Sequence, residues 1–207
     1  MTLATSLVIV LDDELSILRS VDRLLSARGH QVRAHSRPED FFRAGFPPLP
    51  ACLVLDQNLG AVKGTEVHAE MKQRGWDLPT VFLTADWDTH TVVSAMRNGA
   101  DDYLTKPYDP DELVAVVGRA LQRSISVQQA SRDLAEYHRR AATLTNRERL
   151  IVAMVVSGML NKEISDRLEL ALVTIKVHRG RAMRKLGARN TAELAHIAAL
   201  ASITLPS

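Results

Sequence analysis

The sequence contains no apolar run of the roughly 20 residues needed to cross a lipid bilayer, although 46% of its 207 residues are hydrophobic. The N-terminal stretch also lacks the basic segment and long apolar core of a secretory signal. A single cysteine, Cys52, excludes an internal disulfide bond and is typical of a reducing compartment. We therefore expect a cytoplasmic protein without membrane contact, with Cys52 a small buried strand residue rather than a reactive thiol.

The net charge of +2 is small, but the charges are unevenly distributed along the chain. Residues 1–122 contain 12 Lys and Arg against 17 Asp and Glu, whereas residues 123–207 contain 14 against 7. An acidic half joined to a basic half predicts two domains with different partners. A polyanion is the partner that suits the second domain.

The first half of the sequence alternates short aliphatic runs with amphipathic stretches. The strand candidates are residues 7–11, 31–35, 52–55, 80–84 and 101–105. Continuous aliphatic runs are typical of strands buried on both faces, in a parallel sheet with helices on each side. We therefore predict an α/β domain with a five-stranded, doubly wound parallel sheet of the flavodoxin-like kind.

Helix signals lie between the strands. Residues 14–28 and 65–74 are amphipathic stretches that each end before a glycine, and a further helix is expected at about 89–97. The segment SRPE at 36–39 is interpreted as a capping box with proline in the first turn. Asp109 is the expected N-cap of the helix that follows the fifth strand.

Polar residues follow four of the predicted strands. Asp12 and Asp13 follow the first strand, Asp56 the third, Thr84 the fourth and Lys106 the fifth. In a doubly wound sheet these strand ends form the ligand site. Three carboxylates held close together raise one another's pKa unless a cation intervenes, and oxygen ligands suit a hydrated Mg²⁺. A lysine in the same pocket suits a phosphoryl group arriving at a carboxylate.

Residues 143–207 read as four short helices, an all-α helix-turn-helix domain. A capping box at 145–148 opens the first helix, Asn161 caps a short second one, residues 172–186 form the third and Thr191 starts the last. Residues 123–142 are expected to be a helical linker. A dimerising coiled coil is the weaker alternative for this segment because its heptads are poor.

The third of these helices combines an apolar face with a basic face. Residues 172–189 contain six Lys and Arg and no acid. Helical spacing places on the outward face Val173, Lys176, Val177, Gly180, Arg181 and Arg184. A helix packed on one side and positive on the other fits the major groove of DNA. Charge alone would suit a solvated structural helix equally well.

Four segments of the first half resemble the signature segments of a two-component receiver domain, in the expected order: VIVLDDE, CLVLDQNLGAVKG, PTVFLTA and GADDYLTKPYDPDEL. This resemblance implies that Asp56 is the phosphoacceptor. It also implies a Mg²⁺ ion held by Asp13 directly, by Asp12 partly through water, by Asp56 and by the backbone carbonyl of Asn58.

The same resemblance gives Lys106 the role of pairing with the phosphoryl group and Thr84 that of hydrogen-bonding it. Tyr103 would be the aromatic that changes rotamer with Thr84, although it also reads as a half-buried strand residue. One departure concerns the loop after the phosphoacceptor, where Met-Pro is usual and Leu59-Gly60 stands here. Glycine widens the freedom of the loop, so we expect Asn58 to be held less firmly.

Residues 143–200 closely resemble the LuxR-type DNA-binding domain. The resemblance places groove contacts at Lys176, Val177 and Gly180, and phosphate or flanking contacts at Thr174, Arg179 and Arg184. Arg181 belongs to the same basic face. There are departures here too: Glu169 stands where glycine is usual, Ala171 replaces the frequent Ser or Thr cap, and Gly180 interrupts the helix.

Together the two resemblances predict a response regulator of the FixJ/NarL type, with a receiver domain at 1–122, a linker at 123–142 and a DNA-binding domain at 143–207. Phosphorylation of Asp56 by a cognate histidine kinase would control the formation of a homodimer and its binding to double-stranded DNA. RNA polymerase is a further expected partner.

Two alternatives remain at this point. In the first, the receiver is a constitutive dimerisation module and DNA binding does not depend on phosphorylation, a reading supported only by Gly60. In the second, the chain is an aspartate-nucleophile phosphatase, which is disfavoured because Asn58 occupies the usual position of the acid/base aspartate and cannot transfer protons in that way. We therefore expect a regulator rather than an enzyme.

Overall fold

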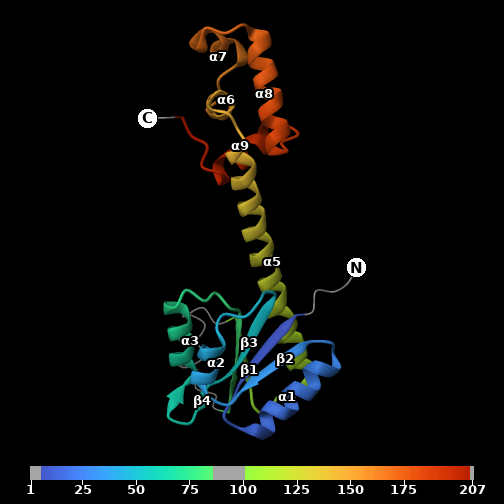
Figure 1. The fold of residues 1–207 in the computed structure, drawn as a ribbon. Helices are drawn as coiled ribbons and strands as arrows, with labels where there is room; N and C mark the ends of the chain where they lie inside the picture. The colour runs from blue at the N-terminus through green and yellow to red at the C-terminus, as the bar shows by residue number, and fades with distance from the viewer. Residues whose placement is uncertain (1–5, 86–100, 206–207) are drawn as a thin grey trace. The chain divides into compact units, whose positions relative to one another are not determined.

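The computed structural model describes residues 6–85 and 101–205 (Figure 1). The chain divides into two compact units, Met1–Gln128 and Gln129–Ser207. The helix expected at about 89–97 lies outside the described residues. Among the described residues, no helix is long and apolar enough to cross a membrane.

The first unit contains a five-stranded parallel sheet, as the aliphatic runs predicted. Its strands are β1 (Leu7–Leu11), β2 (Gln31–His35), β3 (Ala51–Asp56), β6 (Thr80–Thr84) and β7 (Asp102–Thr105). The strand order β2-β1-β3-β6-β7 is that of flavodoxin-like folds, and it places the topological switch point between β1 and β3. Ligands bind such sheets outside the carboxyl ends of the strands at this point.

Helices cover both faces of the sheet (Figure 1). They are α1 (Leu15–Ala27), α2 (Pro38–Ala44), α3 (Gly64–Gln73) and the start of α5 (Pro110–Ala142). Because strand side chains alternate, Val8 and Val10 of β1 pack in one core cluster with residues of α1 and α5. Ile9 and Leu11 pack in the other with residues of α2 and α3. Cys52 is fully buried, and burial raises the pKa of its thiol to about 12, which confirms its structural role.

One helix start differs from its expected form. The N-cap of α2 is Arg37 rather than Ser36, and no side chain caps the helix. The cause is Pro38, which occupies the first helical position and disfavours the helical conformation in the residue before it. Arg37 is accordingly extended, with φ −141° and ψ 142°. Asp109 was predicted correctly, since its Oδ1 accepts a 2.7 Å hydrogen bond from the backbone N–H of Asp111.

Helix α5 continues past the sheet without a break, which confirms the predicted helicity of residues 123–142. Two side chains of this helix bind the chain just before and at the start of β3. The Ser124 hydroxyl, which is buried, accepts a 3.0 Å hydrogen bond from the Ala51 N–H. The Gln128 amide donates a 2.7 Å hydrogen bond to the Leu49 carbonyl. The first unit therefore includes α5 up to this point.

The second unit contains the end of α5 and four short helices, as predicted. These are α6 (Asn146–Val156), α7 (Asn161–Leu168), α8 (Leu172–Leu186) and α9 (Thr191–Leu200). Their apolar faces meet in one core around Ile151, Ile175 and Leu194. The capping box at the start of α6 is present, because Glu148 N–H donates to Thr145 Oγ1 and Thr145 N–H donates to Glu148 Oε2.

The start of α7 is shifted by one residue from its predicted position. Its N-cap is Leu160, not Asn161. The N–H of Leu160 is bound by the Glu163 carboxylate at 2.7 Å, so the acidic residue in the first turn supplies the cap from inside the helix. Asn161 is left to contact another helix, as described below.

Candidate functional site

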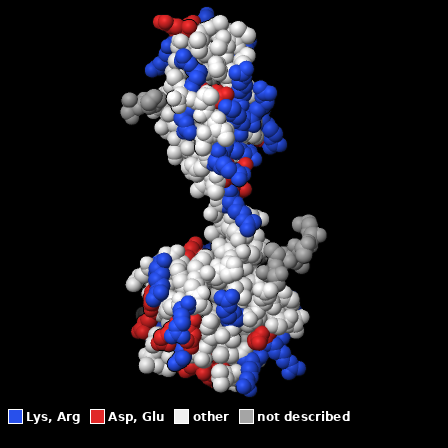
Figure 2. All heavy atoms as spheres, in the orientation of Figure 1, with Lys and Arg blue, Asp and Glu red and all other residues white. Residues whose placement is uncertain are grey.

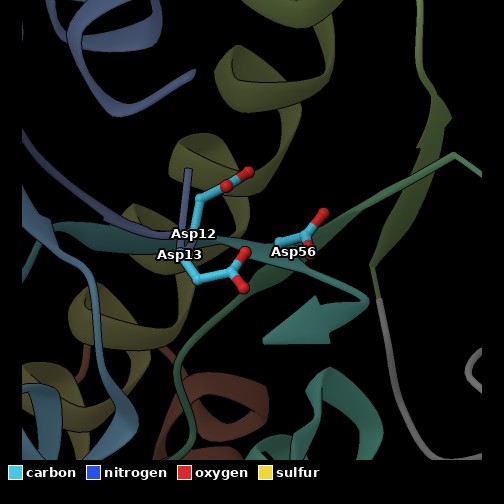
Figure 3. Close-up of side chains that lie close together, drawn as sticks. All are labelled: Asp12, Asp13 and Asp56. Carbon is cyan, nitrogen blue, oxygen red and sulfur yellow. The ribbon is translucent and has the colours of Figure 1, made fainter. Parts of the chain in front are cut away.

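Three carboxylates converge beyond the ends of β1 and β3 (Figure 3). Asp12 and Asp13 follow the last residue of β1, and Asp56 is the last residue of β3. One carboxylate oxygen from each lies within 4.8 Å of the others. Asp12 and Asp56 are buried, whereas Asp13 is exposed. The structure therefore brings together the predicted acidic residues at the switch point of the sheet.

Lys106 bridges two of these carboxylates. Its Nζ donates hydrogen bonds to Asp12 Oδ2 at 2.7 Å and to Asp56 Oδ1 at 2.8 Å. The lysine comes from the end of β7, 94 residues from Asp12 in sequence, and its own N–H binds the Thr84 carbonyl at 2.6 Å. The other oxygen of Asp56 accepts a 2.7 Å hydrogen bond from the Asn58 N–H.

Burial and hydrogen bonding together shift the pKa values of Asp12 and Lys106 in this cluster. Burial raises the pKa of Asp12, although the hydrogen bond from Lys106 opposes that shift. Burial alone would lower the pKa of Lys106, but its hydrogen bonds to Asp12 and Asp56 outweigh burial, and its pKa is raised. Lys106 therefore carries a cationic ammonium at neutral pH, and this group lies beside Asp56.

Thr84 and Tyr103 lie where the strand pattern placed them. Thr84 is the buried last residue of β6, adjacent to the Lys106 backbone. Tyr103 lies on β7 opposite Phe82 of β6 and stacks on that ring, with centroids 5.5 Å apart and an interplanar angle of 16°. It is half-buried, and burial raises the pKa of its phenol. Tyr103 is thus an aromatic residue on β7, the strand that pairs with the strand of Thr84. Its role in switching stays a prediction.

The loop after Asp56 is a small hairpin that the sequence did not predict. It pairs β4 (Asn58–Leu59) with β5 (Val62–Lys63). Gly60 in the turn has φ +65°, a conformation closed to proline, whose ring fixes φ near −65°. Asn58 is bound further by Lys63, whose Nζ donates to its Oδ1 at 2.6 Å. Strand pairing and Lys63 thus give Asn58 two contacts that the sequence did not suggest, and the expectation that it is held less firmly stays a prediction.

Gly64 is a site residue that the sequence reasoning did not single out. A Cβ at this position would lie 2.3 Å from the Asp56 carbonyl oxygen, which is far inside van der Waals contact. Gly64 N–H also donates to the Gln57 carbonyl at 2.9 Å. Only glycine allows the start of α3 to approach the Asp56 backbone this closely. Its place at the end of the motif CLVLDQNLGAVKG was the available signal.

The second unit presents a basic surface over α8 (Figure 2). Ile175, Ala182 and Leu186 of this helix are fully buried. The exposed residues of the opposite side include Lys176, Val177, Arg181 and Arg184, while Thr174 and Gly180 are half-buried. This two-sided helix was predicted from the sequence. A Cβ at Gly180 would meet no atom within 4 Å, so internal packing does not require that glycine.

Two basic residues of α8 form hydrogen bonds with side chains of other helices in the second unit. Arg179 donates to Asn161 Oδ1 at 3.0 Å and to Thr191 Oγ1 at 2.8 Å, which ties α8 to the first turns of α7 and α9. Lys185 donates to Glu148 Oε2 at 2.6 Å, against the capping box of α6. Arg179 was predicted as a phosphate or flanking contact, and its bonds indicate that it also braces the helix-turn-helix.

The turn between α7 and α8 contains two of the three departures from the LuxR-type pattern. Glu169 adopts the left-handed conformation, with φ 53° and ψ 42°, where glycine carries no steric cost. Ala171 is the N-cap of α8 and makes no side-chain cap hydrogen bond. The turn is therefore built as in a helix-turn-helix, with two residues that stabilise it less than the usual ones.

Comparison with known proteins identifies the family of each of the two domains. Residues 8–118 match the response regulator receiver domain family, and residues 142–198 match the luxR family of bacterial regulatory proteins. Nodulation protein W of Bradyrhizobium diazoefficiens is 32% identical over 189 residues, covering 91% of this chain and 83% of that protein. FixJ of Azorhizobium caulinodans is 32% identical over 194 residues, covering 94% and 92%. The chain belongs to the FixJ/NarL-type response regulators.

Solved structures resemble this response regulator over nearly its whole length. A low-resolution structure of the response regulator StyR has a TM-score of 0.82 at 31% identity, covering 95% of this chain and 99% of that one. Full-length FixJ from B. japonicum has a TM-score of 0.58 at 28% identity, covering 95% and 97%. The response regulator thus joins a receiver domain to a LuxR-type DNA-binding domain, as transcriptional regulators of this family do.

Proposed function

We propose that Asp56 accepts a phosphoryl group from a cognate histidine kinase in a Mg²⁺-dependent reaction, and that this modification controls dimerisation and sequence-specific DNA binding. The observation that carries the proposal is the position of Lys106 Nζ, 2.8 Å from Asp56 Oδ1 and 2.7 Å from Asp12 Oδ2. An ammonium held beside a nucleophilic carboxylate is placed to stabilise the charge on a phosphoryl oxygen.

The donor set fits a magnesium ion. Asp12, Asp13 and Asp56 offer only oxygen ligands, and these atoms lie within 4.8 Å of one another, which suits a small hard cation that keeps part of its water shell. The Asn58 carbonyl would complete the protein ligands. When bound, Mg²⁺ would neutralise the oxygens of the transferred group.

Four residues of the chain have separate roles in the proposed phosphoryl transfer. A carboxylate oxygen of Asp56 attacks the phosphorus of a phosphohistidine, so a P–O bond forms while the P–N bond breaks and its electron pair leaves with the imidazole nitrogen. Lys106 exchanges its contact with Asp56 for one with the new phosphoryl group. Thr84 would hydrogen-bond the same group, and the change would reach Tyr103 through the neighbouring strands β6 and β7.

Downstream, two copies of α8 would bind a roughly two-fold site on double-stranded DNA as a homodimer, with RNA polymerase as a further partner at the promoter. The alternative of a phosphorylation-independent regulator is not favoured, since the aspartates, Lys106 and Thr84 lie together and the relatives include transcriptional response regulators. The conformation of Gly60 is explained by the hairpin and gives that alternative no support.

Phosphate incorporation tests the chemistry. The full chain is incubated with acetyl phosphate, with Mg²⁺ or with EDTA, and its intact mass is measured. We expect a phosphoryl adduct on the wild type and on Asp22→Asn, an exposed α1 control, only when Mg²⁺ is present. Asp56→Asn should remain unmodified, and equal modification of that variant would contradict the proposal.

A further inference from the structure

The hairpin of β4 and β5 carries a lysine beside the acidic site. Lys63 of β5 lies opposite Asn58 of β4, and its Nζ donates a 2.6 Å hydrogen bond to Asn58 Oδ1. The backbone N–H of Asn58 in turn donates to Asp56 Oδ2 at 2.7 Å. In the turn of the hairpin, a Cβ at Gly60 would lie 3.8 Å from Asp13 Oδ2. One residue, Asn58, therefore stands between the ammonium of Lys63 and the carboxyl group of Asp56.

Lys63 differs from the other lysines of the first unit in its partner. Lys72 and Lys106 both form ion pairs with aspartates. Within the described part of the chain, the Lys63 ammonium has no carboxylate partner, and its hydrogen bond goes to the neutral amide of Asn58. The residue is exposed, and a lysine ammonium is a compact charge on a flexible stem. This charge is therefore able to move to a new partner.

Local structure does not explain the presence of a lysine here. Lys63 is the N-cap residue of α3 and forms no side-chain cap hydrogen bond. Side chains that accept hydrogen bonds are preferred at an N-cap, and the positive end of the helix dipole disfavours a cation there. A cation that opposes its own helix and lacks an anionic partner indicates a functional role.

Phosphorylation of Asp56 would bring the missing anion. The positive charges of a Mg²⁺ ion and of the Lys106 ammonium together equal the number of carboxylates at the site. A phosphoryl group carries about two negative charges at neutral pH, where a carboxylate carries one, so one negative charge is left without a partner. We propose that Lys63 is the second cation of the phosphorylated site: its Nζ leaves Asn58 Oδ1 and donates to a phosphoryl oxygen on Asp56. The inference rests on the proposed phosphorylation.

Two measurements on the full chain test this role, because they should change in opposite directions. The first is the initial rate of phosphoryl uptake from acetyl phosphate at saturating Mg²⁺, followed by intact mass. The second is the Mg²⁺ affinity of the unmodified protein, followed by the amide resonance of Asn58. In Lys63→Gln, uptake should be about two- to fivefold slower, the range for one exposed ion pair. Mg²⁺ should bind this variant more tightly by a similar factor, because a like charge is removed.

Two further variants separate charge from structure. Glutamine at position 63 can still donate a hydrogen bond to Asn58, so the hairpin should persist in Lys63→Gln. Lys63→Arg retains the charge and should stay close to wild type in both measurements. Lys72→Gln is the matched control, since it removes the same charge in the last turn of α3. It should leave both measurements unchanged.

Four results would contradict the role of Lys63 while phosphorylation of Asp56 stands. Uptake by Lys63→Gln at the wild-type rate is one. Slower uptake combined with weaker Mg²⁺ binding is another, since it would mean that Lys63 only supports the hairpin. Equal slowing in Lys63→Arg would show that charge is not the property required, and equal slowing in Lys72→Gln would assign the effect to net charge. If wild type takes up no phosphoryl group, the proposed function fails together with the inference.

Discussion

Gly64 shows how a residue without a functional group can constrain the backbone around Asp56. A methyl group at this position would lie 2.3 Å from the backbone oxygen of Asp56, and neither backbone segment can move cheaply. We predict that Gly64→Ala destabilises the first unit by about 1–3 kcal/mol and slows phosphorylation of Asp56. Urea unfolding followed by tryptophan fluorescence measures this unit, since Trp76 and Trp87 both belong to it.

Gly118 of α5 provides the matched control for this substitution. A Cβ there would meet no atom within 4 Å, so Gly118→Ala should be neutral or stabilise the helix by up to about 1 kcal/mol. An equal loss of stability in both variants would show that the close approach to Asp56 is not the cause.

Glu148 gives the second unit a defined pH dependence. The hydrogen bond from Lys185 and that from the Thr145 backbone lower the pKa of this buried carboxyl from its ordinary value of 4.5. Because the folded-state pKa lies below the unfolded one, this contribution to stability is fully present above about pH 4.5 and is lost as pH falls through the folded-state value. We predict that Glu148→Gln is less stable than wild type at pH 7 and that the difference shrinks below pH 4.5.

Amide hydrogen exchange of α6, compared between wild type and Glu148→Gln at each pH, measures this difference for the second unit alone. If the difference in α6 exchange protection between wild type and Glu148→Gln stays constant down to the lowest pH, the assigned ion pair with Lys185 is contradicted.

At the scale of elements, the turn between α7 and α8 contains a residue in an unfavourable backbone conformation, so a substitution there can stabilise the second unit. Glu169 is held in the left-handed region at φ 53°, which costs a side-chain-bearing residue about 1–2 kcal/mol. We predict that Glu169→Gly stabilises the second unit by about 1 kcal/mol, because glycine adopts this conformation without strain but loses more entropy on folding. Slower amide exchange in α7 and α8 would report the gain.

Lys162→Gly in the exposed first turn of α7 is the control. The same residue introduced at a helical φ should destabilise the unit by up to about 1 kcal/mol. Destabilisation by Glu169→Gly as well would show that its conformation is not a source of strain.

The elements that could be predicted from the sequence are those with a local cause. Aliphatic runs indicated β1, β3 and β6, whereas β2 and β7 at the two ends of the sheet have mixed sequences. The capping signals at Asp109 and Thr145 marked helix starts that the structure contains. The start of α2 was misplaced because the conformational restriction before Pro38 outweighed a capping pattern. The hairpin of β4 and β5 was missed since two-residue strands leave no periodic signal.

Contacts between residues far apart in the sequence could be predicted only where the strand order determines them. The strand order brought Asp12, Asp56 and Lys106 together as expected, because the ends of parallel strands share one edge of the sheet. The bridge from Arg179 to Asn161 and Thr191 depends on how three helices pack. Helical spacing alone showed only that this arginine belongs to a basic helix.

At the scale of the whole molecule, the chain contains an acidic site in one unit and a basic helix in the other. Helix α5 belongs to both units. In the first, Ser124 and Gln128 bind the chain at β3. In the second, the guanidinium of Arg140 donates a 3.3 Å hydrogen bond to the Leu186 carbonyl at the end of α8. Helix α5 is thus hydrogen-bonded within the first unit to the chain around the start of β3, and within the second unit to the end of α8.

The measurement that tests this account most directly is the affinity of the full chain for a duplex selected from a random pool, with and without acetyl phosphate and Mg²⁺, in wild type and in Asp56→Asn. We predict that phosphorylation tightens binding by wild type about tenfold, within the usual range of coupling between two sites, and leaves the variant unchanged. Equal affinity of wild type before and after phosphorylation, at full modification of Asp56, would contradict the claim that the receiver controls DNA binding.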